Sequence, residues 1–253
     1  MTQSCSNPPK TTDSPVSHSK KDSVNAWIKT SKNTSYTLEQ RKQFLIKAYY
    51  TIKASQIDTL QVRALSTIAY QNLKLKDTAL FKKQTNEVLN LADKLNDSFA
   101  MGDAHWNYAS YYIDMEVYDS AYNHFNAGYS YFEPSGYISN SAKMQYGMAF
   151  IKGRFKDYSG SEVLTFMAIK KFEEIEDHQS LFSSYNHLGQ LQNDVYEYDK
   201  ALFYFDKAIE NLNKLKKNSN LKDAVLNNIG STYLKKRDYR NALLNFNKLL
   251  ENN

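Results

Sequence analysis

Turn-forming residues are scarce in this sequence of 253 residues, which contains only 8 glycines and 4 prolines. Three of the prolines lie within the first fifteen residues, and the stretch from Val16 to Glu133 contains no glycine other than Gly102 and Gly128. A β-sandwich needs turn residues roughly every 8–12 positions. The distribution therefore argues against a β-sandwich and is typical of a chain of long helices. An aromatic content of 14% argues against disorder.

Motifs for chemistry are also missing. No apolar run approaches the ~18 residues of a membrane span. The sequence has no G-x-G-x-x-G, G-x-x-x-x-G-K-[ST] or H-E-x-x-H motif, so nucleotide and metal binding have no motif support. His105 and His187 fall close to packing positions and are interpreted as hydrogen-bonded interface residues. We therefore predict a protein without a cofactor, without a metal and without catalytic residues.

Positive charge is not concentrated on any predicted helix that could bind a groove of a nucleic acid. The net charge is +5. Residues 1–35 carry +3 and residues 213–253 carry +6, which leaves −4 for the middle of the chain. A nucleic-acid-binding protein gathers its basic residues on one element or face. This distribution favours a solvated surface, and we predict no nucleic-acid partner.

Cys5 is the only cysteine, so no disulfide forms within the chain. It precedes a leader rich in Ser, Thr and Pro, and the segment Ser4-Cys5-Ser6-Asn7 resembles the start of a mature bacterial lipoprotein. That resemblance implies lipidation of Cys5, although only Met1–Ser4 stand where an apolar signal segment would be; the alternative is an incidental surface thiol. Residues 1–36 are predicted to be a disordered polar tether, in which Val24, Trp27 and Ile28 offer at most a helical turn.

The pattern changes at Thr37, where Thr37-Leu-Glu-Gln40 forms a capping box that opens a predicted helix over Leu38–Ala54. Beyond it a signature recurs, in which a small residue on one helix is followed by a small residue and an aromatic on the next. Its three clear copies are His105-x-x-Tyr108-Ala109-x-x-Tyr112 with Ala121-x-x-x-Phe125, Tyr185-x-x-Leu188-Gly189 with Ala201-x-x-x-Phe205, and Leu226-x-x-Ile229-Gly230-x-x-Tyr233 with Ala242-x-x-x-Phe246.

This signature resembles the tetratricopeptide repeat, which implies an all-α fold, an α-solenoid of antiparallel helix pairs wound into a right-handed superhelix. The small residues of the first helices (Ala69, Ala109, Gly147, Gly189, Gly230) are spaced 40, 38, 42 and 41 residues apart. The repeats are longer than the family norm of about 34 residues, and Lys143 and Thr165 depart from the pattern. We predict a solenoid over residues 37–253 with about five helix pairs, ending inside a repeat and truncated at the C-terminus.

The longer repeats, together with the segments Arg41 to Tyr49 and Leu95-Asn-Asp97-Ser98, resemble the sensory arrays of sensor histidine kinases and regulators of Bacteroidetes-type bacteria. This implies a non-catalytic sensor in the periplasm or cell envelope, connected to the membrane only by a lipid anchor or by a transmembrane helix outside this sequence. Two alternatives remain. One is a cytoplasmic peptide-responsive regulator of the Rap or pheromone-receptor type, disfavoured because that type implies a leader of three helices and only one clear helix precedes the repeats. The other is a free-standing lipoprotein scaffold.

The tetratricopeptide resemblance implies that the first helices line a concave groove for a peptide or protein partner, with a homodimer as a further option. In the tetratricopeptide family, the positions that face the groove lie three residues before and one residue after the small residue of each first helix, with others one helical turn away. They are Arg63, Ser66, Tyr70, Trp106, Ser110, Asp114, Met144, Met148, Ile151, Asn186, Gln190, Asn193, Asn227, Ser231 and Lys235. Amides suit the backbone of an extended peptide. A carboxylate clamp, which uses Lys and Asn on successive first helices, is not expected, because the first two repeats have Ser66 with Tyr70 and Trp106 with Ser110 at those positions.

Overall fold

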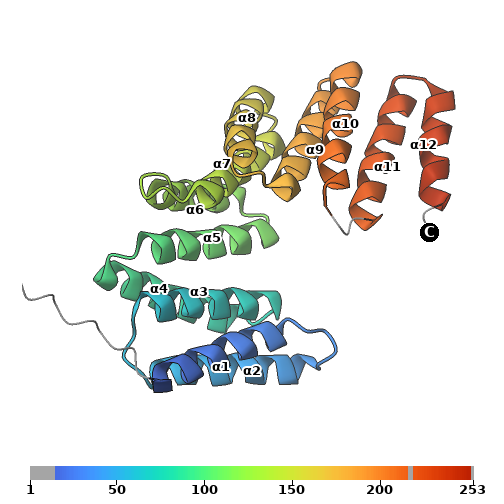
Figure 1. Cartoon of the computed structure of the whole chain (residues 1–253). Helices are drawn as coiled ribbons and strands as arrows, with labels where there is room; N and C mark the ends of the chain where they lie inside the picture. The colour runs from blue at the N-terminus through green and yellow to red at the C-terminus, as the bar shows by residue number, and fades with distance from the viewer. Residues whose placement is uncertain (1–14, 216–218, 252–253) are drawn as a thin grey trace, which may run out of the picture. The chain divides into compact units, whose positions relative to one another are not determined.

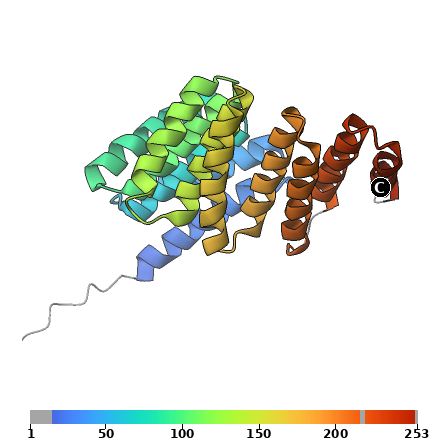
Figure 2. The ribbon, with the colours of Figure 1, turned by 90° about the horizontal axis from the view of Figure 1, so that it is seen from above.

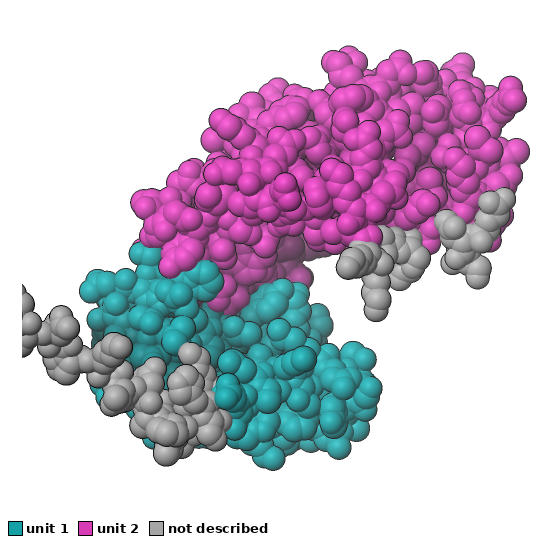
Figure 3. Space-filling view, in the orientation of Figure 1, with its two compact units in different colours: residues 1–100 teal, residues 101–253 magenta. Residues whose placement is uncertain are grey.

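The computed structural model describes residues 15–215 and 219–251, and these residues form twelve helices and no strand (Figure 1). The predicted all-α architecture is confirmed. Cys5 lies outside the described residues. The chain divides into two compact units, Met1–Ala100 and Met101–Asn253, which are coloured teal and magenta in Figure 3. The boundary falls inside a helix, a division that the repeat pattern did not indicate.

Four helices and the beginning of a fifth belong to the first unit, and the rest belong to the second. The helices of the first unit are α1 (Pro15–Ser31), α2 (Leu38–Lys53), α3 (Thr59–Lys74) and α4 (Thr78–Leu95). α5 (Ser98–Asp114) crosses the boundary. The second unit continues with α6 (Tyr118–Phe132), α7 (Ile138–Arg154), α8 (Tyr158–Glu174), α9 (His178–Asp194), α10 (Tyr198–Asn213), α11 (Ser219–Lys235) and α12 (Tyr239–Glu251).

Over residues 15–31, α1 corrects the prediction that residues 1–36 form a disordered tether; residues 1–14 lie outside the described residues. From Pro15 to Ser31 the chain is a helix that packs against α2 and α3. Val24 and Ile28 are buried and Trp27 is half-buried, so the apolar residues noticed in the sequence anchor a full helix rather than a single turn. Their spacing of three to four residues places them on one helical face, which a polar composition had obscured.

The capping box predicted at Thr37 is present at the start of α2. The Gln40 amide N–H donates to the Thr37 hydroxyl at 3.2 Å, and the Thr37 N–H donates to the Gln40 side chain at 2.9 Å. Asp58 and Gln61 form a second capping box at the start of α3. Each box satisfies amide groups that a helix N-terminus otherwise leaves without a partner.

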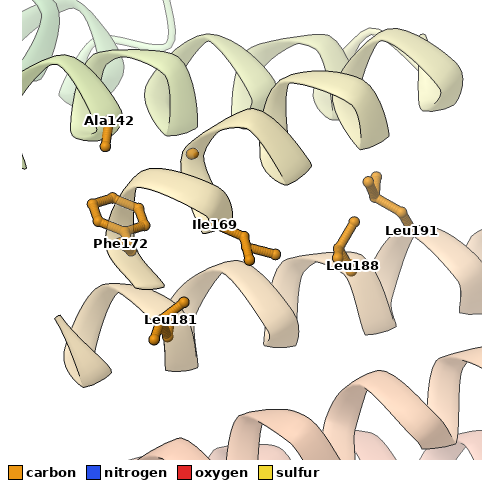
Figure 4. Close-up of a cluster of buried hydrophobic side chains, with 7 residues drawn as sticks. Ala142, Ile169, Phe172, Leu181, Leu188 and Leu191 are labelled. Carbon is orange, nitrogen blue, oxygen red and sulfur yellow. The ribbon is translucent and has the colours of Figure 1, made fainter. Parts of the chain in front are cut away.

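Within the second unit, successive helices pack as antiparallel pairs, and α9 to α12 lie in a row in the view from above (Figure 2). Figure 4 shows the core between α7, α8 and α9, where buried apolar side chains from the three helices point toward one another. Ala142 comes from α7, Ile169 and Phe172 from α8, and Leu188 and Leu191 from α9. Burial of such side chains stabilises each pair by removing apolar surface from water.

The repeated small residues allow close packing of aromatic rings. A Cβ placed on Gly189 would lie 2.5 Å from the ring of Phe205, and one placed on Gly147 would lie 2.6 Å from the ring of Phe125. Phe125 of α6 packs against Gly147 of the next repeat, whereas Phe205 of α10 covers Gly189 of its own repeat.

The turns inside the repeats share one backbone conformation, although they contain no glycine. Lys76, Glu116, Lys156, Tyr196 and Arg237 each have φ between +57° and +66° and each stand two residues before the next helix. The left-handed region is unfavourable for side chains with a Cβ. The identical turns therefore show that helix packing imposes this conformation on whichever residue occupies the position.

Candidate functional site

Side-chain amides gather on the first helices of the last two repeats, α9 and α11, which contact each other. The Asn228 side-chain N–H donates to the side-chain oxygen Oδ1 of Asn186 at 3.0 Å and links the two helices. Asn227, next to Asn228, and Gln190 on α9 are exposed to solvent. We call Asn186, Gln190, Asn193, Asn227 and Ser231 the amide face. Four of its five members carry an amide, and none carries a formal charge.

One member of the amide face has an unsatisfied atom. The Asn193 side-chain oxygen is buried and has no hydrogen-bond partner, while the residue as a whole is half-buried. Buried polar atoms are nearly always paired in folded proteins, and an unpaired one requires an explanation. One such explanation is that the Asn193 oxygen accepts a hydrogen bond only when a ligand is bound and provides the donor. Ser231 is half-buried on α11.

The predicted groove residues of the first unit take part in the packing of that unit. The Arg63 guanidinium binds both oxygens of Asp97 at 2.9 and 2.8 Å and lies 4.6 Å from the centre of the Phe99 ring. The Arg63 hydrogen bonds and the capping N–H groups of Ala100 and Phe99 outweigh burial and lower the pKa of Asp97. Ser66 is buried. Tyr70 is half-buried, with the Lys74 ammonium 5.0 Å from the centre of its ring.

On α5, exposure increases toward the end of the helix. Trp106 is half-buried and meets the Phe125 ring edge-on, with the ring centres 5.8 Å apart. Ser110 is half-buried, and Asp114 is exposed. Trp106 therefore contributes to the contact between α5 and α6, and only part of its surface is available to a partner.

α7 does not offer the apolar groove that was predicted for it. Met148 is 4% exposed, and Met144 and Ile151 are also buried, so their assignment to an open surface is wrong. The reason is that α7 packs against three helices, α6, α8 and α9. Phe150, which the sequence did not single out, is the large apolar residue that α7 exposes. Lys235, predicted at the end of the groove, is exposed on α11.

Three histidines, of which His105 and His124 are half-buried and His187 is buried, belong to the packing between helices. The Nδ1 atoms of His105 and His124 lie 3.0 Å apart, and burial together with the His124 ring lowers the pKa of His105 to about 4. Burial also lowers the pKa of His124, whose ring stacks against both Tyr108 and Tyr112. Within the described part of the chain, no group of three or more His, Cys, Asp or Glu side chains is placed to hold a metal ion.

His187 and Ser161 form a hydrogen bond that does not resemble a nucleophile and its base. The Ser161 hydroxyl donates to the Ala149 carbonyl oxygen at 2.7 Å and lies 2.9 Å from the His187 Nε2 atom. Its only proton is thereby used, so Nε2–H is the donor in the second bond. Burial lowers the pKa of His187 to about 4. The pair holds α7, α8 and α9 together, and Ser161 replaces the alanine found at this position in the neighbouring repeats.

The family positions missed two side chains that link the first helices of successive repeats. Asn228 was passed over because only its neighbour Asn227 falls at the family position. The Tyr146 hydroxyl donates to the Ser183 carbonyl oxygen at 3.2 Å and joins α7 to α9. The spacing between the bonded residues is 42 for Asn228 and Asn186 and 37 for Tyr146 and Ser183. Polar residues about one repeat apart would have indicated these contacts.

Comparisons with known proteins identify the fold. No protein-family model matches the sequence, and no curated protein matches it. BtubC from P. vanneervenii matches the structure with a TM-score of 0.69 at 17% identity, with 90% of each chain covered. The TPR-like repeats of a Podosopora anserina kinesin light chain match with a TM-score of 0.61 at 10% identity, over 76% of this chain and 94% of theirs.

A third match is NprR in complex with its cognate peptide NprX. Its TM-score is 0.62 at 12% identity, and the match covers 93% of this chain and 67% of NprR. At such identities the likeness concerns the fold alone. The chain therefore has the fold of tetratricopeptide-like helical repeat solenoids, as its repeat signature predicted.

Proposed function

We propose that this chain is a non-catalytic binding domain that holds an extended peptide against the amide face of α9 and α11. The observation that carries the proposal is the row of amides on adjacent first helices, with exposed Gln190 and Asn227 beside the hydrogen-bonded Asn186. An extended peptide presents N–H and C=O groups that have no partner within its own chain. Side-chain amides match both kinds of group, because each carries a donor and an acceptor.

The proposal predicts recognition of a backbone rather than of a charge. The amide face has no formal charge, so long-range electrostatic attraction contributes little to binding there. Asn193 adds a buried acceptor that lacks a donor in the free chain. Among the matched structures, NprR is bound to a cognate peptide, which supports a peptide as the kind of ligand that this fold accommodates.

Peptides selected from a random library on the whole chain provide the test. Their affinities are measured by fluorescence anisotropy for the unaltered protein and for the Gln190→Ala and Asn227→Ala variants. Both residues are exposed, so neither substitution disturbs the core. We expect each to weaken binding about fivefold, which corresponds to roughly 1 kcal/mol per lost hydrogen bond.

Asn126→Ala is the matched control, because Asn126 is an exposed amide on a second helix, α6, outside the amide face. It should leave the affinity unchanged. Selected peptides whose affinity is unaffected by both amide-face substitutions would show that the peptide binds elsewhere. Trp106 is unsuited to this test, because its contact with Phe125 makes its removal a change in stability as well.

For the biological setting we propose the extracytoplasmic sensor part of a bacterial signalling protein. The support is the sequence around Cys5 and the resemblance of the long repeats to sensory arrays. The helices in the described ranges, 15–215 and 219–251, include none that is long and apolar enough to cross a membrane. Digestion of intact spheroplasts by an added protease tests the location: an extracytoplasmic chain is cleaved, and a protected chain contradicts this proposal.

A cytoplasmic peptide-responsive regulator is the second candidate, and one structural observation favours it. The argument against it was that this type needs a leader of three helices, whereas the sequence showed one clear helix ahead of the repeats. The structure has two helices there, α1 and α2, which pack against each other, so the leader lacks one helix rather than two. The match to NprR with its peptide agrees with this candidate as well. Protection from protease in spheroplasts, together with peptide binding at the amide face, would support it over the sensor.

A further inference from the structure

A pocket of about 430 Å³ opens in the second unit where the start of α6 meets the end of α7 and the turn into α8. α6 and α7 are neighbours in the fold (Figure 1). The volume of the pocket lies within the range of roughly 300–1,000 Å³ that is usual for small-ligand sites. The pocket is lined by Asp119, Tyr122, Asn123, Ile151, Lys152, Phe155 and Asp157. None of these residues belongs to the amide face.

The charges in the pocket leave one carboxylate without a cation. Lys152 donates to the Asp157 carboxylate at 2.6 Å, and the Gly160 N–H at the start of α8 donates to the same carboxylate at 2.9 Å. The Lys152 hydrogen bond is the main reason why the pKa of Asp157 is lowered. The charges of Lys152 and Asp157 therefore neutralise each other. Asp119 makes no ion pair with another described residue and is exposed in the first turn of α6.

The other walls of the pocket are aromatic or neutral. Phe155 is 57% exposed, unusually for a large apolar side chain, and meets the Tyr118 ring edge-on with the ring centres 6.1 Å apart. Tyr122 adds a second ring and Asn123 an amide oxygen that can accept a hydrogen bond. Electron-rich ring faces attract organic cations. A net charge of −1 combined with two rings therefore suits a flat cationic group with an apolar stem.

We propose that this pocket binds the side chain of an arginine in a partner polypeptide. The guanidinium donates to the two oxygens of Asp119, a geometry in which charged groups form two parallel hydrogen bonds. Its methylene stem and its flat face lie against Phe155 and Tyr122. Met115 and Val117, in the turn just before α6, are 55% and 44% exposed and offer apolar contacts for the residues beside that arginine.

The chemistry of the pocket disfavours other occupants. An anion would face the unpaired Asp119 carboxylate, and a purely apolar group would strip water from that carboxylate without replacing its hydrogen bonds. A second copy of the chain would bring another net negative pocket toward this one if it paired through the same surface. The site is independent of the amide face, so the failure of either proposal leaves the other standing.

The test uses N-acetyl-arginine-N-methylamide as the probe and the ¹H–¹⁵N correlation spectrum of the whole chain as the readout. We expect binding with a millimolar dissociation constant, with shifts confined to the amides of residues 115–124 and 150–158. Asp119→Asn should weaken binding at least fivefold, and Phe155→Ala about threefold without altering any charge. The neutral analogue N-acetyl-citrulline-N-methylamide, which keeps the shape and loses the charge, should not bind.

Glu174→Gln is the matched control, because Glu174 is an exposed carboxylate at the end of α8 outside the pocket. It should leave the affinity of the probe unchanged. An equal loss in Asp119→Asn and Glu174→Gln would show non-specific charge attraction and overturn the proposal. Equal shifts with the citrulline analogue, or shifts that appear only on α9 and α11, would overturn it as well.

Discussion

Replacing Gly189 by alanine gives the sharpest test of how the repeats pack. In an open helix this change stabilises, because glycine is less favourable than alanine by about 1 kcal/mol. Here the added Cβ would lie 2.5, 2.6 and 2.9 Å from three ring atoms of Phe205. Phe205 is completely buried within a cluster that includes Phe182 and Val225. The ring therefore cannot move aside without displacing its neighbours.

The magnitude follows from the balance of two effects. Overpacking a well-packed core costs typically about 1–3 kcal/mol. A contact this close to a fully buried ring favours the upper half of that range. After subtraction of the gain in helix propensity, the free energy of unfolding should fall by about 1–2 kcal/mol. For a chain of this size the midpoint of thermal unfolding should then fall by about 5 °C.

A double-mutant cycle measured by circular dichroism checks this reasoning. Phe205→Leu removes the ring, so Gly189→Ala should become neutral or stabilising in that background. The difference between the two backgrounds is the coupling between the added methyl group and the ring. An increase in stability of about 1 kcal/mol in the unaltered protein would refute the argument. So would an identical cost with and without the ring.

Three further predictions address the turns, the histidines and the buried ion pair. Lys156→Gly should raise the midpoint of thermal unfolding by about 2 °C. Lys156 has φ +62°, and removing the steric strain of its Cβ in this left-handed conformation stabilises slightly more than the entropic cost of glycine destabilises. An unchanged or lower midpoint contradicts this prediction. The pKa values of His105 and His187 are depressed to about 4 from 6.5, so the stability they contribute is complete above pH 6.5 and is lost as the pH falls toward 4; a flat thermal midpoint across that window opposes it. Asp97→Ala should cost about 3 kcal/mol in chemical denaturation, because it leaves Arg63 without its partner and α5 without its cap; a loss under 1 kcal/mol would show that the pair is dispensable.

The repeat signature predicted the helix pairs because packing acts directly on residue size. A glycine such as Gly147 or Gly189 recurs where a ring from a neighbouring helix must approach, and that requirement is visible in the sequence. The helix at residues 15–31 was missed for the opposite reason. Its apolar residues Val24 and Ile28 are few, and their value depends on α2 and α3, which cover them.

The candidate site was predictable only in part, because exposure depends on every helix around a position. Family positions on α9 and α11 gave Gln190 and Asn227, which are exposed. The same positions on α7 gave Met148, which three neighbouring helices bury. Asn228 could not be found by position, since its role arises from a hydrogen bond to a residue of the preceding repeat.

The sequence by itself therefore determined local and periodic features: the helix starts, the repeat of about 40 residues and the places where helices come close. These depend on capping groups and residue volumes that each segment carries with it. Only the tertiary structure decided which side chains face solvent, the division into two units inside α5, and the pocket beside Asp119. Those features arise where surfaces distant in sequence meet, and there the solvation of a side chain is set by its neighbours rather than by its own chemistry.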